Sequence, residues 1–217
     1  MKTDEQDSEK TAISVGVLAL QGDYGAHQRL LEGLGAQVHL VRRPQDLEAI
    51  DGLLIPGGES TVMSRLCERY DLLEPLRAKI GAGMPTFGTC AGLIFLAREI
   101  GGASLNFPQT TLGMLDVRVE RNAYGAQIDS FETDLSVAEI GENVRAVFIR
   151  APRIAQVGAN VEILAKHENA PVLVRQGTII ALSFHPEIAG ENRIHQMWIE
   201  TVQAAQNSAT SFQKAVL

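Results

Sequence analysis

The sequence predicts a single α/β domain, a doubly wound and mostly parallel β-sheet flanked by helices, with antiparallel hairpins in its second half. Up to Ile100, buried strand patterns alternate with helical patterns, which is typical of a parallel sheet covered on both faces. After Gly101 and Gly102, short strand patterns follow one another through turns, which favours hairpins. With 217 residues, 45% of them hydrophobic, the chain is long enough to bury a substantial core.

The elements of the first half follow from apolar runs and helix signals. Strands are expected at 13–20, 38–41, 53–55 and 84–87, and helices at 24–34, 43–50, 62–70 and 93–100. Gly35 ends the first of these helices. Pro44 stands at the start of the second, where the first turn of a helix tolerates proline.

The second half is expected to consist of strands and one closing helix. Strand candidates occupy 115–121, 127–133, 146–149, 161–166, 171–175 and 178–184. A hairpin is expected around Gln176 and Gly177, and an amphipathic helix at 193–205. We expect residues 1–11 to form a polar, disordered tail, residues 12–206 the single domain, and residues 207–217 a C-terminal tail.

Cys90 is the first candidate functional residue because it lies in the sequence Gly88-Thr89-Cys90-Ala91-Gly92 between a strand and a helix. A nucleophile at such a turn is exposed at the sheet edge, and the amide of the next residue, Ala91, can donate to an oxyanion. The start of a helix also favours a thiolate. Taken alone, the motif fits a small apolar cysteine in a glycine-rich turn equally well.

His185 and Glu187 form the second candidate group, at the end of the strand expected at 178–184. In an extended segment, positions two apart point to the same side, so Glu187 can orient the imidazole of His185. Together with Cys90, this arrangement supplies a nucleophile, a base and an orienting carboxylate. By itself, a histidine near a carboxylate in a surface turn is common.

A third group follows the strand at 53–55, in the sequence Pro56-Gly57-Gly58-Glu59-Ser60. Gly58 lacks a Cβ and can turn its N–H outward as a second oxyanion donor, while Ser60 or Thr61 can cap the next helix. An ordinary junction between strand and helix explains the same residues.

In this order, the three groups resemble the class I, triad-type glutamine amidotransferases, and further segments are similar to the family of glutaminase subunits of pyridoxal 5′-phosphate synthase. The resemblance runs from about residue 15 to residue 202. The further segments are Gly16–Gly22, Val119–Asn122, Asp129–Glu132 and Phe148–Pro152. Segment 101–112 departs from the family pattern by being longer, and we interpret it as a surface loop.

The resemblance implies a glutaminase that passes ammonia to a (β/α)8-barrel pyridoxal 5′-phosphate synthase subunit in a hetero-oligomer. It implies catalysis by Cys90, His185 and Glu187, with Ala91 and Gly58 as oxyanion donors. The residues implied to bind L-glutamine are Gly58, Glu59, Ser60, Arg121, Ile149 and Arg150. Guanidinium groups suit the α-carboxylate of glutamine, although spacing alone leaves Arg121 and Arg150 equally open as surface ion-pair residues.

Composition narrows the choice of partners. The net charge of −7 and the lack of a basic cluster interleaved with aromatics argue against nucleic acid. No apolar stretch approaches the ~20 residues of a membrane span, and the polar N-terminus does not resemble a signal peptide, so a cytoplasmic protein is expected. Cys67 shares a helical face with apolar residues and is interpreted as a core residue.

No cofactor or metal is expected, because the remaining histidines show no metal-binding spacing. They are interpreted as structural or surface residues: His27, His39, His167 and His195. Gln21, Gly22 and Asp23 follow the first strand and are left without a role. Two rival interpretations remain, namely a glutaminase that serves another acceptor, such as imidazole-glycerol phosphate synthesis, and a non-catalytic regulatory subunit on the same fold.

Overall fold

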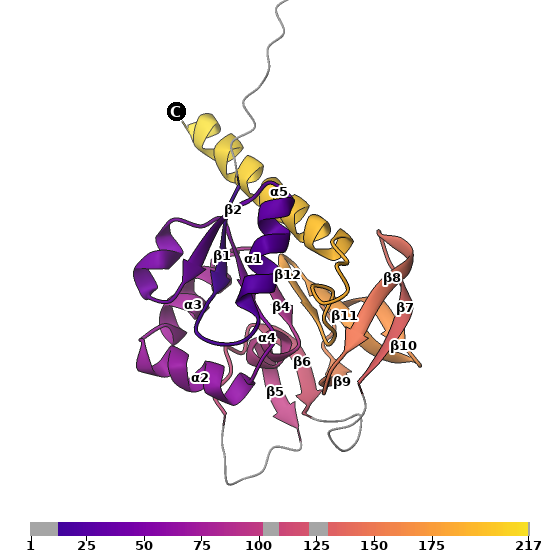
Figure 1. Cartoon of the computed structure of the whole chain (residues 1–217). Coiled ribbons are helices and arrows are strands. Elements are labelled where there is room, and N and C mark those ends of the chain that lie inside the picture. The colour runs from indigo at the N-terminus through magenta and orange to yellow at the C-terminus, as the bar shows by residue number, and fades with distance from the viewer. Residues whose placement is uncertain (1–12, 102–108, 122–129, 217) are drawn as a thin grey trace, which may run out of the picture.

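The computed structural model describes residues 13–101, 109–121 and 130–216, and its centre is a seven-stranded sheet. The strands are β1 (Ser14–Leu18), β2 (Gln37–Val41), β3 (Gly52–Ile55), β4 (Thr86–Thr89), β10 (Glu162–His167), β11 (Ala170–Gln176) and β12 (Ile179–Leu182). Their order across the sheet is β10-β11-β12-β4-β3-β1-β2 (Figure 1). A short 3₁₀ helix (Pro44–Glu48) follows β2.

Five neighbouring strands of this sheet are parallel, which confirms the predicted fold class. β2, β1, β3, β4 and β12 pair in parallel, whereas β11 and β10 continue the sheet in antiparallel fashion. The predicted hairpin at Gln176 and Gly177 joins β11 to β12. Because β12 runs parallel to β4, the carboxyl ends of β1, β3, β4 and β12 lie along one edge, where sites gather in open α/β sheets.

Helices cover both faces of the sheet. One face carries α1 (Tyr24–Gly33) and α5 (Arg193–Val216), and the other carries α2 (Ser60–Arg69), α3 (Leu73–Gly81) and α4 (Ala91–Leu96). The two cores follow from strand alternation in β3, since Leu54 packs on the side of α5 while Leu53 and Ile55 pack on the side of α2. Figure 1 shows α1 and α5 side by side.

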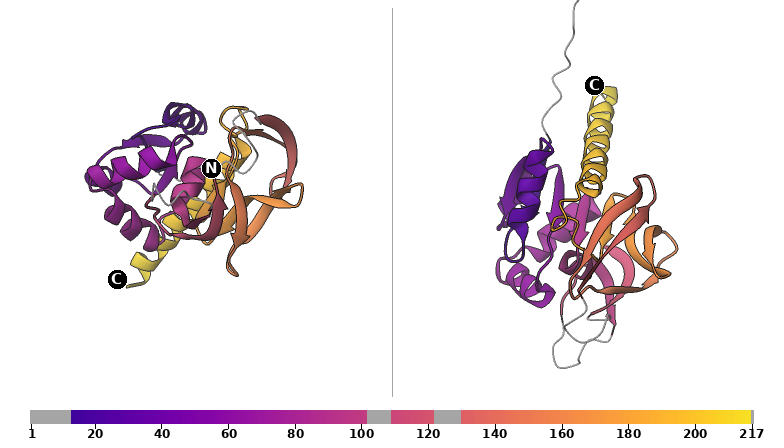
Figure 2. Two further views of the ribbon diagram at one scale, coloured as in Figure 1. Left: turned by 90° about the horizontal axis from the view of Figure 1, so that it is seen from below. Right: turned by 45° about the vertical axis from the view of Figure 1, so that its right-hand side comes forward.

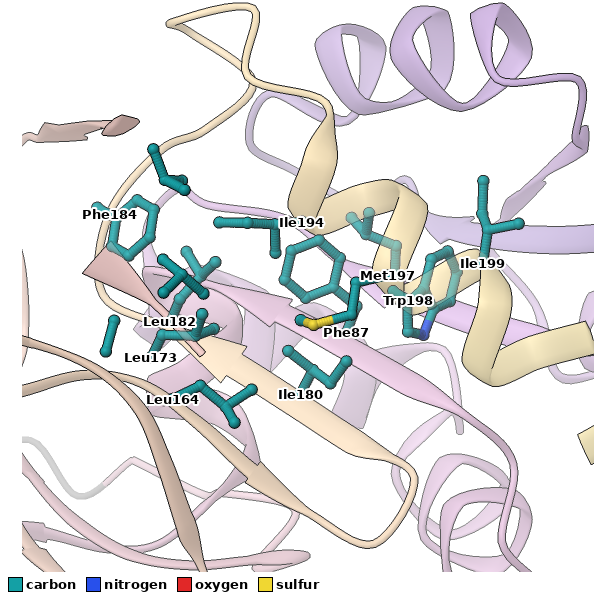
Figure 3. Packing of buried hydrophobic residues seen from close by; sticks show 14 of the residues in the cluster. Phe87, Leu164, Leu173, Ile180, Leu182, Phe184, Ile194, Met197, Trp198 and Ile199 are labelled. Carbon is teal, nitrogen blue, oxygen red and sulfur yellow. The ribbon is translucent and has the colours of Figure 1, made fainter. Parts of the chain in front are cut away.

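Helix α5 packs its apolar face across the centre of the sheet. In Figure 3, Ile194, Met197 and Trp198 point toward Phe87 of β4 and Ile180 of β12. Phe87, Ile194 and Trp198 are fully buried. The start of this helix is therefore fixed close to the sheet edge where β4 and β12 end.

Two smaller sheets complete the domain beside the main one (Figure 2). The first contains β5 (Ala97–Gly101), β6 (Leu115–Glu120) and β9 (Arg153–Val157), and the second is the hairpin of β7 (Phe131–Val137) and β8 (Gly141–Phe148). The backbone N–H of His185 donates to Val147 O at 2.8 Å, so the β7–β8 hairpin reaches the segment that follows β12.

The helix expected at 93–100 is wrong in its second half. Helix α4 ends at Leu96, where Ala97 adopts φ −58° and ψ 146°, and residues 97–101 form β5. β5 pairs in parallel with β6, and its exposed Arg98 and Glu99 form ion pairs with Asp116 and Arg118. Strand pairing overrides the helical spacing of the apolar residues here.

Further elements differ from the sequence-based expectation. Helix α3 and strand β9 are not among the predicted elements. Strand β7 begins at Phe131 and runs to Val137, beyond the expected 127–133, whose first residues lie outside the described part of the chain. Helix α5 continues through 207–216 where a tail was expected, because no glycine or proline interrupts it between Arg193 and Val216. The expected tail at 1–11 also lies outside the described residues.

Within the described residues, none of the helices has the length and apolar character needed to cross a membrane. Likewise, the described histidine, cysteine and acidic side chains include no group of three placed to hold a metal ion.

Candidate active site

Cys90 lies at a tight turn between β4 and α4, at the carboxyl edge of the main sheet. Its backbone has φ 48° and ψ −97°, a conformation that non-glycine residues rarely adopt. Such strain costs about 1–3 kcal/mol and is typical of functional sites. The turn is fastened to the sheet, since Cys90 N–H donates to Leu182 O of β12 at 2.8 Å. Together these features form a nucleophile elbow.

Gly88 and Gly92, which flank Cys90, are needed for close packing and not for the backbone conformation of the turn. A Cβ on Gly92 would lie 2.2 Å from Ile55 O, and a Cβ on Gly88 would lie 2.6 Å from Leu96 Cδ1. Neither glycine has a positive φ, which occurs at Cys90 instead. The glycines are therefore needed because α4 packs directly against β3 and β4.

His185 and Glu187 lie in the loop after β12 and form a hydrogen-bonded pair. His185 Nδ1 is 2.7 Å from Glu187 Oε1. Since a carboxylate only accepts, Nδ1 carries the donated proton and Nε2 is left for Cys90. The Glu187 side chain is fully buried. The predicted contact is present, but Pro186 and Glu187 lie in a turn and not in an extended segment, so the turn brings the two side chains together.

The electrostatics of the site keep His185 protonated. Burial lowers the pKa of His185, but hydrogen bonds and charge interactions with Cys90 and Glu187 outweigh burial and raise it to about 10. At neutral pH, the imidazolium is therefore held between the cysteine and the carboxylate. A protonated imidazole beside a leaving group is a general acid.

The loop between β3 and α2 forms the opposite wall of the site. Gly57 packs against the imidazole, since a Cβ there would lie 2.4 Å from His185 Cε1. Gly58 has φ 147° and is exposed, as is Glu59, whereas Ser60 is buried. Glu59 N–H donates to Gln21 Oε1 at 3.0 Å, so Gln21, which the sequence left without a role, fastens this loop to the end of β1.

A cavity of about 150 Å³ opens between these elements. Its lining contains Cys90, His185 and every residue predicted to bind L-glutamine, with Ile94 as an addition that the sequence did not suggest. The lining residues are Gly58, Glu59, Ser60, Cys90, Ile94, Arg121, Ile149, Arg150 and His185. Two guanidinium groups and one carboxylate in a small cavity match the charges of a free amino acid.

The charged side chains of the cavity contact partners from different elements. Arg150 Nη2 lies 3.4 Å from Glu59 Oε1. Arg121 Nη1 donates to Thr61 Oγ1 and to Gln109 Oε1, both at 3.1 Å. Both arginines line the cavity, and Arg150 also forms a half-exposed ion pair with Glu59, so lining the cavity and surface ion pairing are not alternatives for Arg150.

Gln109 is a further residue that the sequence did not single out. Its Oε1 accepts from Ser60 Oγ at 3.1 Å, Thr61 Oγ1 at 3.2 Å and Arg121 Nη1. It belongs to segment 101–112, which was interpreted as a surface loop. Residues 102–108 lie outside the described part of the chain, but the end of the segment supports the cavity. No motif marks an isolated glutamine for this position.

Two of the histidines interpreted as structural or surface residues are buried next to the triad. His27 Nδ1 lies 2.9 Å from His195 Nε2, and both side chains are fully buried. His27 Nε2 lies 3.2 Å from Thr89 Oγ1 and 3.5 Å from Glu187 Oε1. Only the fold brings these residues together.

The second cysteine has a different environment. Cys67 lies on the buried face of α2 and is fully inaccessible to solvent. Burial, with a smaller effect of Glu68, raises the pKa of its thiol to about 12. Both cysteines are free. Cys67 is therefore an unreactive thiol at neutral pH, as expected of a core residue.

A parallel α/β sheet with a cysteine elbow and a histidine–glutamate pair at its carboxyl edge is typical of triad-type amidotransferases. The sequence profile of the SNO glutamine amidotransferase family matches residues 17–204. The chain therefore belongs to the SNO glutamine amidotransferase family.

Individual relatives agree with this assignment. The pyridoxal 5′-phosphate synthase subunit PdxT of Thermosipho africanus is 47% identical, over 88% of this chain and 100% of that protein. The protein of the same name from Pelotomaculum thermopropionicum is 50% identical, over 90% of this chain and 98% of its own length.

Solved structures share the fold. A crystal structure of a glutamine amidotransferase, 45% identical, superposes with a TM-score of 0.81 over 87% of this chain and 98% of that one. A chain in the structure of PurLQS from Thermotoga maritima is only 16% identical but reaches a TM-score of 0.67 over 87% of this chain. The second likeness concerns the fold alone.

Proposed function

We propose that this protein hydrolyses L-glutamine to glutamate and ammonia with Cys90, His185 and Glu187, and passes the ammonia to a pyridoxal 5′-phosphate synthase subunit. The observation that carries the proposal is the elbow cysteine next to a His185–Glu187 pair, in a cavity lined by Glu59, Arg121 and Arg150. Relatives that are 45–50% identical and share the name PdxT support the choice of acceptor.

In the first half of the reaction, Cys90 Sγ attacks the side-chain amide carbon of glutamine, and the amide oxygen becomes an oxyanion. The N–H groups of Ala91 and Gly58 donate to this oxyanion. The imidazolium of His185 gives its proton to the leaving nitrogen, so ammonia departs and a thioester remains. Arg121 and Arg150 hold the α-carboxylate of the substrate, and Glu59 lies where its carboxylate attracts the α-ammonium group.

In the second half, water attacks the thioester carbon while His185 takes a proton from the water. The bond to Cys90 Sγ breaks, glutamate leaves, and the imidazolium is regenerated. Glu187 stabilises the imidazolium and keeps Nδ1 as the donor throughout. The thioester is the intermediate that links the two halves, and a tetrahedral oxyanion precedes each bond cleavage.

Ammonia released into water at neutral pH becomes ammonium, which is not nucleophilic. The useful product therefore requires an acceptor enzyme that receives it through a protected path. We propose a (β/α)8-barrel synthase subunit in a hetero-oligomer as that acceptor. A free cysteine nucleophile suits a reducing compartment, and we place the reaction in the cytoplasm.

The partner is also proposed to activate the glutaminase. Gly58 lies in an exposed part of the loop between β3 and α2, so a docked subunit can turn its N–H toward the oxyanion. One such donor contributes about 10²–10³ in rate, which is enough for docking to prevent wasteful hydrolysis.

The test is glutamate release by the purified chain, alone and mixed with a barrel-type synthase subunit, with Cys90→Ala as the blank. We expect slow hydrolysis alone and a large increase in the mixture. Equal rates would exclude the activation step, and hydrolysis by Cys90→Ala at the unmodified rate would exclude the triad. An acceptor other than a pyridoxal phosphate synthase is favoured only if that other synthase stimulates release instead.

A further inference from the structure

His27 is a buried histidine that the reaction described above does not use, yet it lies against the triad carboxylate. Its Nε2 is 3.5 Å from Glu187 Oε1 and 3.2 Å from Thr89 Oγ1, and its side chain is fully inaccessible to solvent. Glu187 Oε2 has no hydrogen-bond partner within the described part of the chain. His185 and His27 are therefore the two imidazole rings that the structure places near this carboxylate.

The contact is between a neutral ring and an acceptor, not an ion pair. Burial, followed by the nearby His195 and His185, lowers the pKa of His27 well below 6.5. Burial likewise lowers the pKa of His195 to about 3. Both rings are therefore uncharged at neutral pH, and each carries one N–H proton.

A hydrogen bond to the Glu187 carboxylate would favour one tautomer of His27 and, through His27, one tautomer of His195. Because the oxygens of Glu187 only accept, the favourable form of His27 has its proton on Nε2, directed at Glu187 Oε1 and Thr89 Oγ1. His27 Nδ1 is then an acceptor, and His195 Nε2, 2.9 Å away, supplies the donor. The chain of contacts runs from His195 through His27 and Glu187 to His185.

From this geometry, we infer that His27 is a positioning residue that, supported by His195, holds the Glu187 carboxylate and so keeps His185 oriented toward Cys90. The inference deepens the proposed glutaminase and rests on it. A carboxylate with one donor is free to rotate away from its histidine, whereas a second donor from another element limits that rotation.

The fold makes this support rigid. His27 comes from α1, whose start is capped by Asp23 accepting from Ala26 N–H at 3.2 Å. His195 comes from the first turn of α5, and its ring packs edge-on against Phe87 at 5.1 Å between centroids. The helices α1 and α5, far apart in the sequence, thus meet at the triad (Figure 1).

The test compares His27→Gln with His27→Asn, because the amide nitrogen of glutamine reaches the place of Nε2 and that of asparagine only the place of Nδ1. Both variants keep a polar group of similar size, so thermal melting should show similar losses of stability. The first readout needs no turnover: the proton of His185 Nδ1 in the hydrogen bond to Glu187, followed by NMR in the full chain labelled with ¹⁵N-histidine.

We expect this proton resonance to remain in His27→Gln and to broaden or shift toward the free-imidazole position in His27→Asn. In the complex with the synthase, His27→Asn should lower kcat about tenfold with KM within about twofold, whereas His27→Gln should stay within about threefold of the unmodified protein. In a Glu187→Gln background, His27→Asn should cause no further loss, because the group it positions is gone.

Besides the Thr89→Val outcome given below, three results would overturn the inference. They are an unchanged Nδ1 proton in His27→Asn, equal kcat in the two His27 variants, and an undiminished effect of His27→Asn in the Glu187→Gln background. Thr89→Val, which leaves His27 in place and removes its other acceptor, should retain the resonance and most of the activity. A loss equal to that of His27→Asn would assign the role to Thr89 instead. Failure of the proposed function itself would appear separately, as turnover that Cys90→Ala does not abolish.

Discussion

The two strand-to-helix junctions that face each other across the cavity are built in opposite ways. The junction between β4 and α4 is enclosed, with Cys90 only 7% exposed and Thr89 and Ala91 fully buried. The junction between β3 and α2 leaves Gly58 and Glu59 exposed. Both follow buried strands and both depend on glycine, yet only the first is buried throughout.

The difference suits two roles: the junction that carries the nucleophile must be rigid, and the junction that carries Gly58 must respond to a docked subunit. A nucleophile gains from a fixed position, because small displacements of a reacting atom reduce the rate strongly. Gly58, the proposed second oxyanion donor, and Glu59 lie on the exposed loop, where another subunit can reach them. We therefore expect changes at Cys90 and at the packed glycines of the enclosed junction to act on chemistry or folding, and changes at the exposed junction to act on activation and substrate affinity.

The largest expected effect is at the enclosed junction. Cys90→Ala or Cys90→Ser should abolish glutamine hydrolysis, a loss of at least about 10³-fold, because no other group forms the thioester. Cys67→Ala should leave most of the activity. A glutamine-derived electrophile should label Cys90 and spare Cys67, whose thiol pKa is raised to about 12. Peptide mass spectrometry that finds Cys67 as the main adduct would reverse the assignment of the two cysteines.

The second prediction concerns His185, which links the two junctions because Gly57 packs against its ring. His185→Asn should reduce kcat more than Glu187→Gln, since the imidazole moves the proton and the carboxylate orients it. The glutaminase rate should fall as pH rises through about 10, because deprotonated His185 cannot protonate the leaving nitrogen.

The same residue gives the direction of a pH shift. Glu187 helps to raise the pKa of His185, so in Glu187→Gln the alkaline fall in rate should begin at lower pH. Initial rates measured with brief exposure to each pH would test this. An alkaline limb that stays in place, or a Glu187→Gln enzyme slower than His185→Asn, would contradict the division of roles.

Much of this site could be predicted from the sequence because its parts are local. The elbow, the His185–Glu187 pair and the glycine loop each lie within a few residues, and a short turn after a strand determines how their side chains point. His27 and Gln109 could not be found in this way. Each reaches the site from a different element, and only the sheet order brings α1 and α5 together at β4.

The fold shows the same limit. Parallel strands and covering helices followed from alternation and periodicity, which are properties of short segments. The end of α4 at Leu96 did not, because residues 97–101 leave the helix to pair with β6, more than ten residues further along the chain. Strand β9 likewise depends on pairing with β6.

A third prediction compares one glycine from each junction. Gly92→Ala should destabilise the fold by roughly 1–3 kcal/mol, since its Cβ would lie 2.2 Å from a backbone oxygen of β3. In Gly58→Ala, the new Cβ would lie too close to the Gln21 side chain and to the Cα of Gly22. The residue would also need a positive φ, so the substitution should displace the exposed loop. We expect it to remove much of the activation by the synthase, up to about 10²–10³, while the thermal transition changes little. Equal losses of stability would show that the two junctions are equally rigid.

The smallest effect on glutamine turnover is expected at Gln109, which accepts hydrogen bonds from Ser60 and Thr61 at the start of α2. Its Oε1 accepts from Ser60, Thr61 and Arg121, so it holds the guanidinium in the cavity without contacting Cys90. Gln109→Ala should raise KM for glutamine about three- to tenfold at nearly constant kcat, since one hydrogen bond contributes about 0.5–1.5 kcal/mol. Thr110→Val is the matched control, because its hydroxyl donates to Glu68 and makes no contact with Arg121. A fall in kcat at constant KM would instead show that Gln109 acts on the chemical step and not on substrate affinity.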